Sequence, residues 1–288
     1  MGVLFLIIAT VTNSLSYVFE KYFTKRCVFL FTAISQFLCG IAFLIVSKFQ
    51  LSFNPAIWGY AISIMVLATI NACALNMAVQ RGDLSITGLI SSLSLIVTTI
   101  LSIIFLNGKP SVYFIAGFFL LIVAMVLINV QFGKKKEKEK EKKKFDPLWL
   151  ILSLIALFAN GVSSFLVAKQ ENVFNAQYNN EIMIIAFMLS SAVTLIIALV
   201  FESGEKIKEG GKSALLWGAL CGIALGLMNV FVLLSVAEVH ASIVFPVISG
   251  GSMILIFISS LIFFKEKYTI SQYIGFALSV VSLVLLSL

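Results

Sequence analysis

Charged residues are scarce in this 288-residue chain. They make up 11% of the sequence, whereas hydrophobic residues make up 60%. Soluble proteins carry about a quarter charged residues, so the composition excludes an ordinary soluble protein, and a mean hydropathy of +1.09 excludes a disordered one. The cysteines stand far apart, without a CxxC motif or a Cys/His cluster, which predicts neither a disulfide framework nor a metal site: Cys27, Cys39, Cys73 and Cys221.

The formal charge of +7 is concentrated in one run. Lys134 to Lys144 contains eight Lys and three Glu, and the other charges fall mostly in short gaps between apolar segments. This distribution is typical of a membrane protein and argues against a nucleic-acid partner. We therefore predict that the chain lies in a lipid bilayer and that residues 133–146 form a solvated linker.

Ten apolar segments are each about as long as the roughly 20 residues that a helix needs to cross a bilayer. The runs are continuous, which excludes the short alternating strands of a β-barrel. The sequence thus predicts an all-α polytopic membrane protein with ten transmembrane helices over 2–22, 28–47, 56–79, 84–106, 111–132, 147–168, 181–201, 214–237, 241–264 and 269–288.

The linker divides the chain into two similar halves, 1–132 and 147–288. Three residue pairs recur 157 or 158 residues apart: Ser85/Ser242, Ser92/Ser249 and Gly117/Gly275. Five spans in each half require the second half to be inserted upside down relative to the first. Inverted five-helix repeats are characteristic of secondary transporters, whose binding sites lie near the middle of the bilayer.

Lys and Arg are distributed unevenly between the two sets of loops. The set that includes the linker holds 17 of the 20, and the other set holds Lys48, Lys109 and Lys169. The positive-inside rule then places linker 133–146 in the cytoplasm and both termini outside.

Polar side chains gather at mid-depth in eight of the ten segments. In lipid such groups either join helices by hydrogen bonds or line a wet cavity. Their occurrence at one depth in both halves favours a substrate cavity lined by Asn13, Gln36, Asn71, Ser92, Asn160, Ser164, Asn229 and Ser249. Pro246, Gly250 and Gly251 predict an interrupted helix that acts as a hinge, with a static kink as the alternative.

Acidic and basic residues are absent from the middle of every segment. Glu20 is the deepest acid and lies beside Lys21. It is a member of an ion pair at the membrane boundary or, alternatively, a carboxylate that couples transport to protons. Gly218, Gly222 and Gly226 form a GxxxGxxxG ridge that permits close helix packing. No nucleophile with a base, carboxylate pair or metal-ligand set occurs at depth, so we predict neither an enzyme nor a cofactor.

The second half carries motifs of a known family. The segments SIVFPVISGG and FFKEKYTISQYIGFAL resemble the last two helices of an EamA-like repeat of the drug/metabolite transporter superfamily. The glycine-rich eighth segment and Glu266 after the ninth also resemble that family, whereas the first half has Gly108 in place of this acid. The resemblance implies export by alternating access through a cavity between the repeats, without specifying the substrate. It also implies cytoplasmic termini, opposite to the charge count.

The sequence as a whole predicts a multi-pass transporter of the plasma or inner membrane. We expect it to export a small polar or amphipathic metabolite, either amino-acid-like or neutral, because no charge lies at mid-depth. Two alternatives stay open: proton-coupled efflux of cationic drugs through Glu20, and a membrane scaffold that transports nothing. The sequence also leaves open whether the chain forms a homodimer.

Overall fold

The computed structural model is all-helical, as the apolar runs predict. It describes residues 2–23, 27–49, 54–105, 112–129, 146–175, 177–238 and 241–286, apart from some side chains within the helices. The linker lies outside this part of the chain except for Asp146, so the boundaries at 132 and 147 stay a prediction.

Most helices begin and end close to the expected residues because apolar runs and the polar gaps between them set their limits. Two limits differ: α9 begins at 204 and not at the expected 214, and α7 ends at 174 and not at the expected 168. The first half contains α1 (Gly2–Tyr22), α2 (Val28–Val46), the short 3-10 helix η1 (Pro55–Ile57), α3 (Trp58–Arg81), α4 (Leu84–Ser92), α5 (Ser94–Phe105) and α6 (Val112–Asn129). The second half contains α7 (Pro147–Phe174), α8 (Asn179–Phe201), α9 (Gly204–Glu238), α10 (Ala241–Phe263) and α11 (Ile270–Leu286).

One expected helix is interrupted. The segment predicted over 84–106 is divided at Leu93, where the Leu93 N–H donates to the Ile90 carbonyl oxygen at 3.1 Å. Such i→i−3 bonds tighten the chain locally and allow a helix to change direction. By contrast, α10 runs as one helix through the predicted interruption at Gly250 and Gly251. The break thus occurs in the first half, and not at the place that proline and paired glycines indicated.

Several helices are long and apolar enough to cross a bilayer. Within the described residues these are seven segments, in one of which α4 and α5 together cover Leu84–Phe105. Two shorter apolar helices, Gly250–Phe263 and Ile270–Ser282, accompany them. These lengths agree with the roughly 30 Å thickness of the hydrocarbon core.

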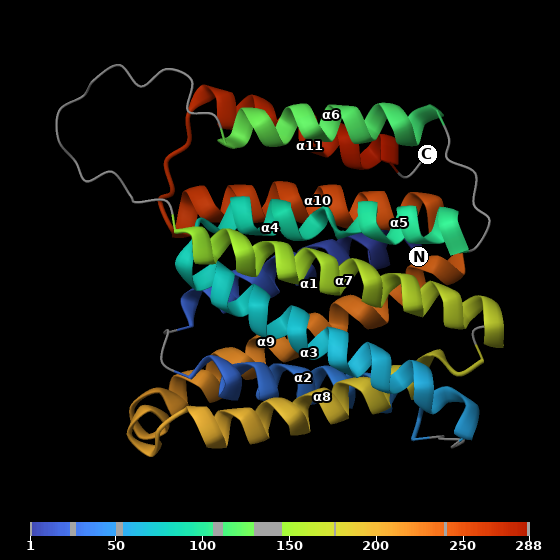
Figure 1. The fold of residues 1–288 in the computed structure, drawn as a ribbon, viewed down its shortest axis with the longest axis vertical. Coiled ribbons are helices and arrows are strands. Elements are labelled where there is room, and N and C mark those ends of the chain that lie inside the picture. The colour runs from blue at the N-terminus through green and yellow to red at the C-terminus, as the bar shows by residue number, and fades with distance from the viewer. Residues whose placement is uncertain are drawn as a thin grey trace.

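The helices are arranged in successive levels along the long axis of the molecule (Figure 1). From one edge to the other these are α6 with α11, α4 and α5 with α10, α1 with α7, α3 with α9, and α2 with α8. Contacts between levels also combine the halves, since α1 packs against α9 and α3 against α7. Each level therefore contains one contribution from each half of the chain.

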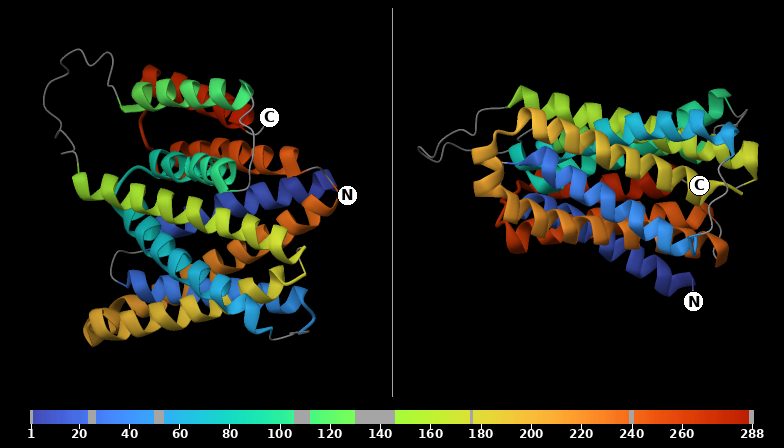
Figure 2. Two further views of the ribbon diagram at one scale, coloured as in Figure 1. Left: turned by 45° about the vertical axis from the view of Figure 1, so that its right-hand side comes forward. Right: turned by 90° about the horizontal axis from the view of Figure 1, so that it is seen from below.

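The two ends of the bundle differ in what they carry. The chain termini lie at one end, called here the terminal end (Figures 1 and 2). At the other end α3 stops and α7 starts, and Arg81 pairs with Asp146 at 3.3 Å. We call this the linker end, because α6 ends and α7 begins there.

The glycine ridge of α9 packs directly against α2. A Cβ atom at Gly222 would lie 2.6 Å from the Ser35 carbonyl oxygen, and one at Gly226 would lie 2.6 Å from the Ala42 Cβ. Small residues at such positions allow two helix backbones to approach closely. The packing role predicted for the ridge is therefore confirmed.

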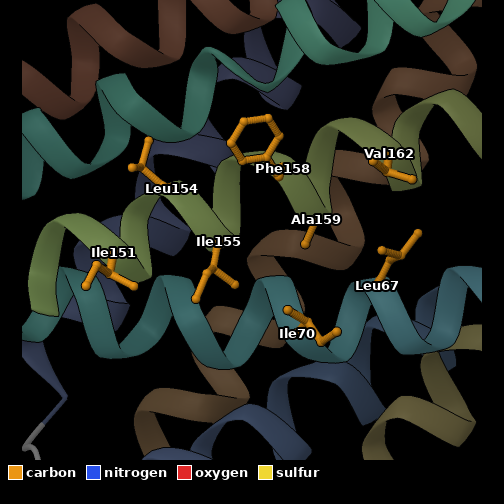
Figure 3. Close-up of a pocket in the computed structure, with 8 residues that line it drawn as sticks. All are labelled: Leu67, Ile70, Ile151, Leu154, Ile155, Phe158, Ala159 and Val162. Atoms are coloured by element: carbon orange, nitrogen blue, oxygen red, sulfur yellow. The ribbon is translucent and has the colours of Figure 1, made fainter.

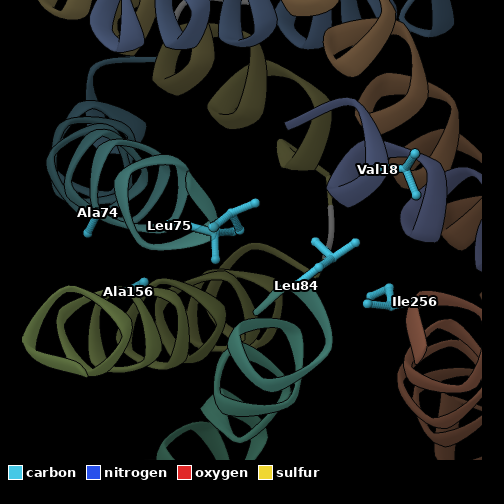
Figure 4. Packing of buried hydrophobic residues seen from close by; sticks show 7 residues of the cluster. Val18, Ala74, Leu75, Leu84, Ala156 and Ile256 are labelled. Carbon is cyan, nitrogen blue, oxygen red and sulfur yellow. The ribbon is translucent and has the colours of Figure 1, made fainter. Parts of the chain in front are cut away.

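A cluster of buried apolar residues joins both halves at the centre (Figure 4). It comprises Val18 of α1, residues of α3, Leu84 of α4, Ala156 of α7 and Ile256 of α10. Because five helices share this cluster, the positions of the polar side chains next to it are fixed by packing.

Candidate functional site

Two asparagines from the predicted cavity make equivalent hydrogen bonds in the two halves. Asn13 of α1 donates to Ser252 Oγ of α10 at 3.1 Å. Asn160 of α7 donates to Ser94 Oγ of α5 at 2.8 Å. Ser94 and Ser252 are 158 residues apart, the same spacing that relates other residues of the halves. Both amides thus join helices from different halves through their N–H groups.

Asn229 is directed to a different level of the bundle. Its amide donates to the Leu225 carbonyl oxygen at 2.8 Å and approaches Cys39 Sγ of α2 at 3.9 Å. The asparagines therefore do not meet at one point, as a single ring of substrate ligands would. Asn13 and Asn160 bind toward the α5/α10 level, and Asn229 toward α2.

Two of the predicted cavity residues keep an amide oxygen that is buried and without a partner among the described residues. These are Gln36 Oε1 on α2 and Asn71 Oδ1 on α3. A buried acceptor without a hydrogen bond costs about 1–3 kcal/mol. Such an atom is expected where water or a ligand supplies the missing donor. Gln36 and Asn71 are thus the strongest candidates for substrate contact.

The remaining predicted residues divide into three groups. Ser92 donates to the Gly88 carbonyl oxygen of its own helix at 2.9 Å, and Ser164 is half-buried on α7. The side chains of Ser249 and Pro246 lie outside the described residues. Gly251 lies close to α1, since a Cβ there would be 2.8 Å from Thr10 Cγ2. The hinge role of Pro246, Gly250 and Gly251 stays a prediction.

Glu20 lies inside the bundle. It is 5% exposed, and its Oε1 accepts from Cys221 Sγ of α9 at 3.9 Å. Its Oε2 has no hydrogen-bond partner among the described residues. The neighbouring Lys21 instead donates to carbonyl oxygens at the end of α3, at 2.8 Å in the case of Val79. An ion pair between Glu20 and Lys21 is therefore not seen within this part of the chain, because adjacent residues on α1 face different helices.

Further polar groups form a line that extends from Glu20. Tyr17 lies within electrostatic range of Glu20, and its hydroxyl donates to Ser91 Oγ of α4 at 3.1 Å. Cys39, the thiol approached by Asn229, lies within electrostatic range of Cys221. The line thus connects α1, α2, α4 and α9 through the interior.

A second polar strip, between α2, α3 and α8, lies outside the predicted set of cavity residues. Asn76 donates to Thr32 Oγ1 at 2.9 Å, and Thr69 donates to Ser190 Oγ at 2.8 Å. Gln80, one turn beyond Asn76, has a buried amide nitrogen without a described partner. The available signal was the i, i+4 spacing of Asn76 and Gln80, which puts both side chains on one face of α3.

The described residues outline an apolar groove on the outside of the bundle (Figure 3). It has a volume of about 420 Å³ and lies between α3 and α7. Ile151 and Phe158 in its wall are each more than half exposed. This groove lacks the polar groups that the predicted substrate site requires. It is therefore a separate feature from the polar site predicted inside the bundle. Its lining is Leu67, Ile70, Ile151, Leu154, Ile155, Phe158, Ala159 and Val162.

Two acidic side chains of the second half bind helix starts of the first half. Glu202, directly after α8, accepts from the N–H groups of Phe29 at 2.8 Å and Leu30 at 3.3 Å. Glu266, after α10, accepts from the N–H of Leu84 at 2.9 Å. Carboxylates satisfy free N–H groups and complement the helix dipole at such positions.

Glu202 gives a testable pH dependence. Burial raises the pKa of Glu202, opposed by the N–H groups of Phe29 and Leu30 and by the charge of Lys206. A raised folded-state pKa stabilises the fold below the ordinary carboxyl pKa of about 4.3, and this contribution is lost as the pH rises through the raised value. Relative to Glu202→Gln, we expect the melting temperature of the wild type to be highest in acid and to fall across that window. A difference that grows with pH would contradict this assignment.

The fold and its polar interior define a multi-pass helical membrane protein. Residues 1–130 match the model of the EamA-like transporter family. A solved crystal structure that is 15% identical in sequence covers 99% of this chain and 96% of its own length with a TM-score of 0.65. That likeness shows the fold over both halves. No curated protein matches the sequence.

Proposed function

We propose that the chain is a secondary transporter that exports a small polar or amphipathic metabolite by alternating access. In this proposal ten membrane spans form two inverted repeats, with α4 and α5 acting as one interrupted span. The substrate binds between the repeats, and neutral or amino-acid-like solutes fit an interior in which amides and hydroxyls predominate.

The helix arrangement supports two repeats. Exchanging the halves maps α1 onto α7, α2 onto α8, α3 onto α9, α4 and α5 onto α10, and α6 onto α11. Under this exchange the contact of α1 with α9 becomes that of α7 with α3, and both are present. The amide–hydroxyl bonds of Asn13 and Asn160 correspond in the same way. Repeats related in this manner permit two alternative openings around one site.

The observation that carries the proposal is that two of the predicted cavity residues have buried amide oxygens without described partners, Gln36 Oε1 and Asn71 Oδ1. In a bundle held only by interhelical hydrogen bonds, both oxygens would be expected to accept one. A substrate with N–H or O–H groups would supply the missing donors. Substrate binding thus explains why α2 and α3 carry buried amides at these positions.

Transport is tested with purified protein in liposomes and a panel of neutral and zwitterionic metabolites. Solutes that raise the melting temperature in detergent are tested first, because binding to the folded state stabilises it. We expect uptake of at least one such solute. Asn71→Leu is expected to reduce it and the exposed Ser63→Ala on the same helix to leave it unchanged. Tight binding of another protein without movement of any solute would favour a scaffold instead.

A second function is favoured by the environment of Glu20. A carboxylate that is 5% exposed and has one oxygen without a described partner is suited to exchange a proton or to bind a cationic amine. Proton-coupled efflux of cationic drugs would use this group directly.

Glu20→Gln separates the two functions because it keeps the shape of the side chain and removes its charge. If Glu20 couples transport to protons, uptake driven by a pH gradient falls to the level of empty liposomes, while exchange of labelled for unlabelled substrate continues. Unchanged gradient-driven uptake excludes Glu20 as the coupling group and leaves the metabolite transporter.

The orientation in the membrane belongs to the same proposal. The excess of Lys and Arg at the linker end supports a cytoplasmic linker in a plasma or inner membrane. The orientation is tested by introducing a cysteine within residues 133–146 and treating intact cells with a membrane-impermeant thiol reagent. Labelling of this cysteine would show that the linker lies outside the cell and would contradict the proposed orientation.

A further inference from the structure

The hydrogen bonds between the halves are distributed unevenly along the bundle. At the linker end, second-half groups bind the starts of α2 and α4 through Glu202, Glu266, Tyr268, Trp149 and the Lys206 carbonyl oxygen. At the terminal end, within the described residues, Asn54 of the first half donates to the Tyr178 hydroxyl of the second at 3.2 Å. Among the described residues, more hydrogen bonds between the halves thus occur at the linker end.

Local backbone geometry directs the carboxylates of Glu202 and Glu266 from the second half toward the first half. Lys265 has a φ of 51°, and this left-handed residue turns the chain after α10 so that Glu266 lies beside Leu84. Glu266 also binds the Tyr268 hydroxyl, which in turn binds Ser85 of α4. Glu202 is the residue after α8, and its extended conformation directs it to the start of α2.

Both contacts involve N–H groups that a helix leaves free. The N–H groups of Phe29, Leu30 and Leu84 belong to the first turns of α2 and α4 and have no acceptor within their own helices. Separation of the halves at this end would leave these groups and two carboxylates to water. Glu202, with 7% of its surface exposed, would undergo the larger change in solvation.

We propose that Glu202 and Glu266 form a two-point latch that holds the linker end closed, and that release of both carboxylates from α2 and α4 opens this end. The inference rests on the proposed alternating-access function and adds its gate. In the first half, Gly108 stands where the second half has Glu266, so an equivalent acidic latch from that position is not available to the terminal end.

The test measures distances between spin labels in the full-length protein. Cysteines replace Arg81 and Lys208, which lie on α3 and α9 at the linker end, in a background where the four native cysteines are changed to Ala or Ser. Both labels stand on helices, so a change reports movement of the halves and not of a loop. A second pair, at Gly59 and Val173, reports on the terminal end.

In Glu202→Ala/Glu266→Ala we expect the linker-end distance to lengthen by about 5 Å, the scale of such rearrangements, while the terminal-end distance stays equal or shortens. Glu202→Gln/Glu266→Gln keeps an acceptor oxygen at each site and is expected to stay close to the wild type. Glu205→Ala, which removes an exposed acid in the first turn of α9, serves as the charge control.

Unchanged distances in the folded alanine variant overturn the latch, and lengthening at both ends overturns it too, because it indicates general loosening. If the double variant does not fold, the single alanine variants are measured. Each removes one of the two points and is expected to shift part of the linker-end distance distribution to longer distances, and unchanged distributions in both overturn the proposal. These distances need no substrate. Failure of the latch is therefore distinguishable from failure of transport, which shows as wild-type liposomes that move no solute.

Discussion

Replacement of Gly222 by leucine is expected to abolish the folded protein. The Cβ atom alone would lie 2.6 Å from the Ser35 carbonyl oxygen, 2.8 Å from the Ser35 Cα and 2.9 Å from the Leu38 Cβ. Two of these atoms are backbone, which cannot move aside without displacing α2. We therefore expect α2 and α9 to separate and the variant to aggregate or lose its thermal transition in detergent.

A graded variant makes this prediction quantitative. Gly222→Ala introduces the same overlap with the smallest side chain and should cost about 1–3 kcal/mol, the usual range for overpacking. Gly59→Ala is the matched control, because it also lies in a helix but has open space around the added carbon. It should leave stability equal or slightly higher, since alanine favours helices. Equal melting temperatures for the two alanine variants would show that the ridge is not a close contact.

Gln36→Leu is expected to weaken substrate binding without weakening the fold. The amide oxygen of Gln36 is buried and has no described partner. Its removal therefore eliminates an unpaired buried acceptor without breaking a hydrogen bond to that oxygen. A substrate donor that meets leucine stays unpaired, which costs about 1–3 kcal/mol, or about 5–150-fold in affinity. The melting temperature without ligand should stay equal or rise.

The two readouts separate a ligand contact from a structural one. Thr69→Val is a suitable comparison, because it removes the 2.8 Å bond to Ser190 and should lower the melting temperature. Substrate affinity is measured by the ligand-induced shift in melting temperature or by equilibrium binding. Unchanged affinity of Gln36→Leu, or a loss of stability equal to that of Thr69→Val, would remove Gln36 from the site.

The positions of the helices could be predicted from the sequence because lipid imposes a strong constraint. A run of apolar residues in a bilayer must satisfy its backbone internally, so it forms a helix wherever it is long enough. The limits of α1 and α2 follow from this constraint. The break at Leu93 could not be predicted in the same way, because neither glycine nor proline marks it and it depends on how α4 and α5 pack against α7 and α10.

The candidate site was predictable in its composition but not in its connections. The sequence places Asn13, Asn160 and Glu20 within apolar segments, and it cannot say which neighbouring helix each side chain meets. Partners such as Ser252 for Asn13 and Cys221 for Glu20 are more than 200 residues away in the chain. Which amides are hydrogen-bonded and which are free therefore depends on how the helices pack.

The sequence by itself determined that this protein is a helical bundle in a membrane, divided by a charged linker and bearing polar groups inside each half. Hydropathy and charge are properties of short segments, and a bilayer responds to segments one at a time. Only the tertiary structure decided which polar atoms are already satisfied, where α9 contacts α2, and that acids of one half bind the helix starts of the other. Those features depend on distances between segments remote in the chain, which are fixed when the helices pack together.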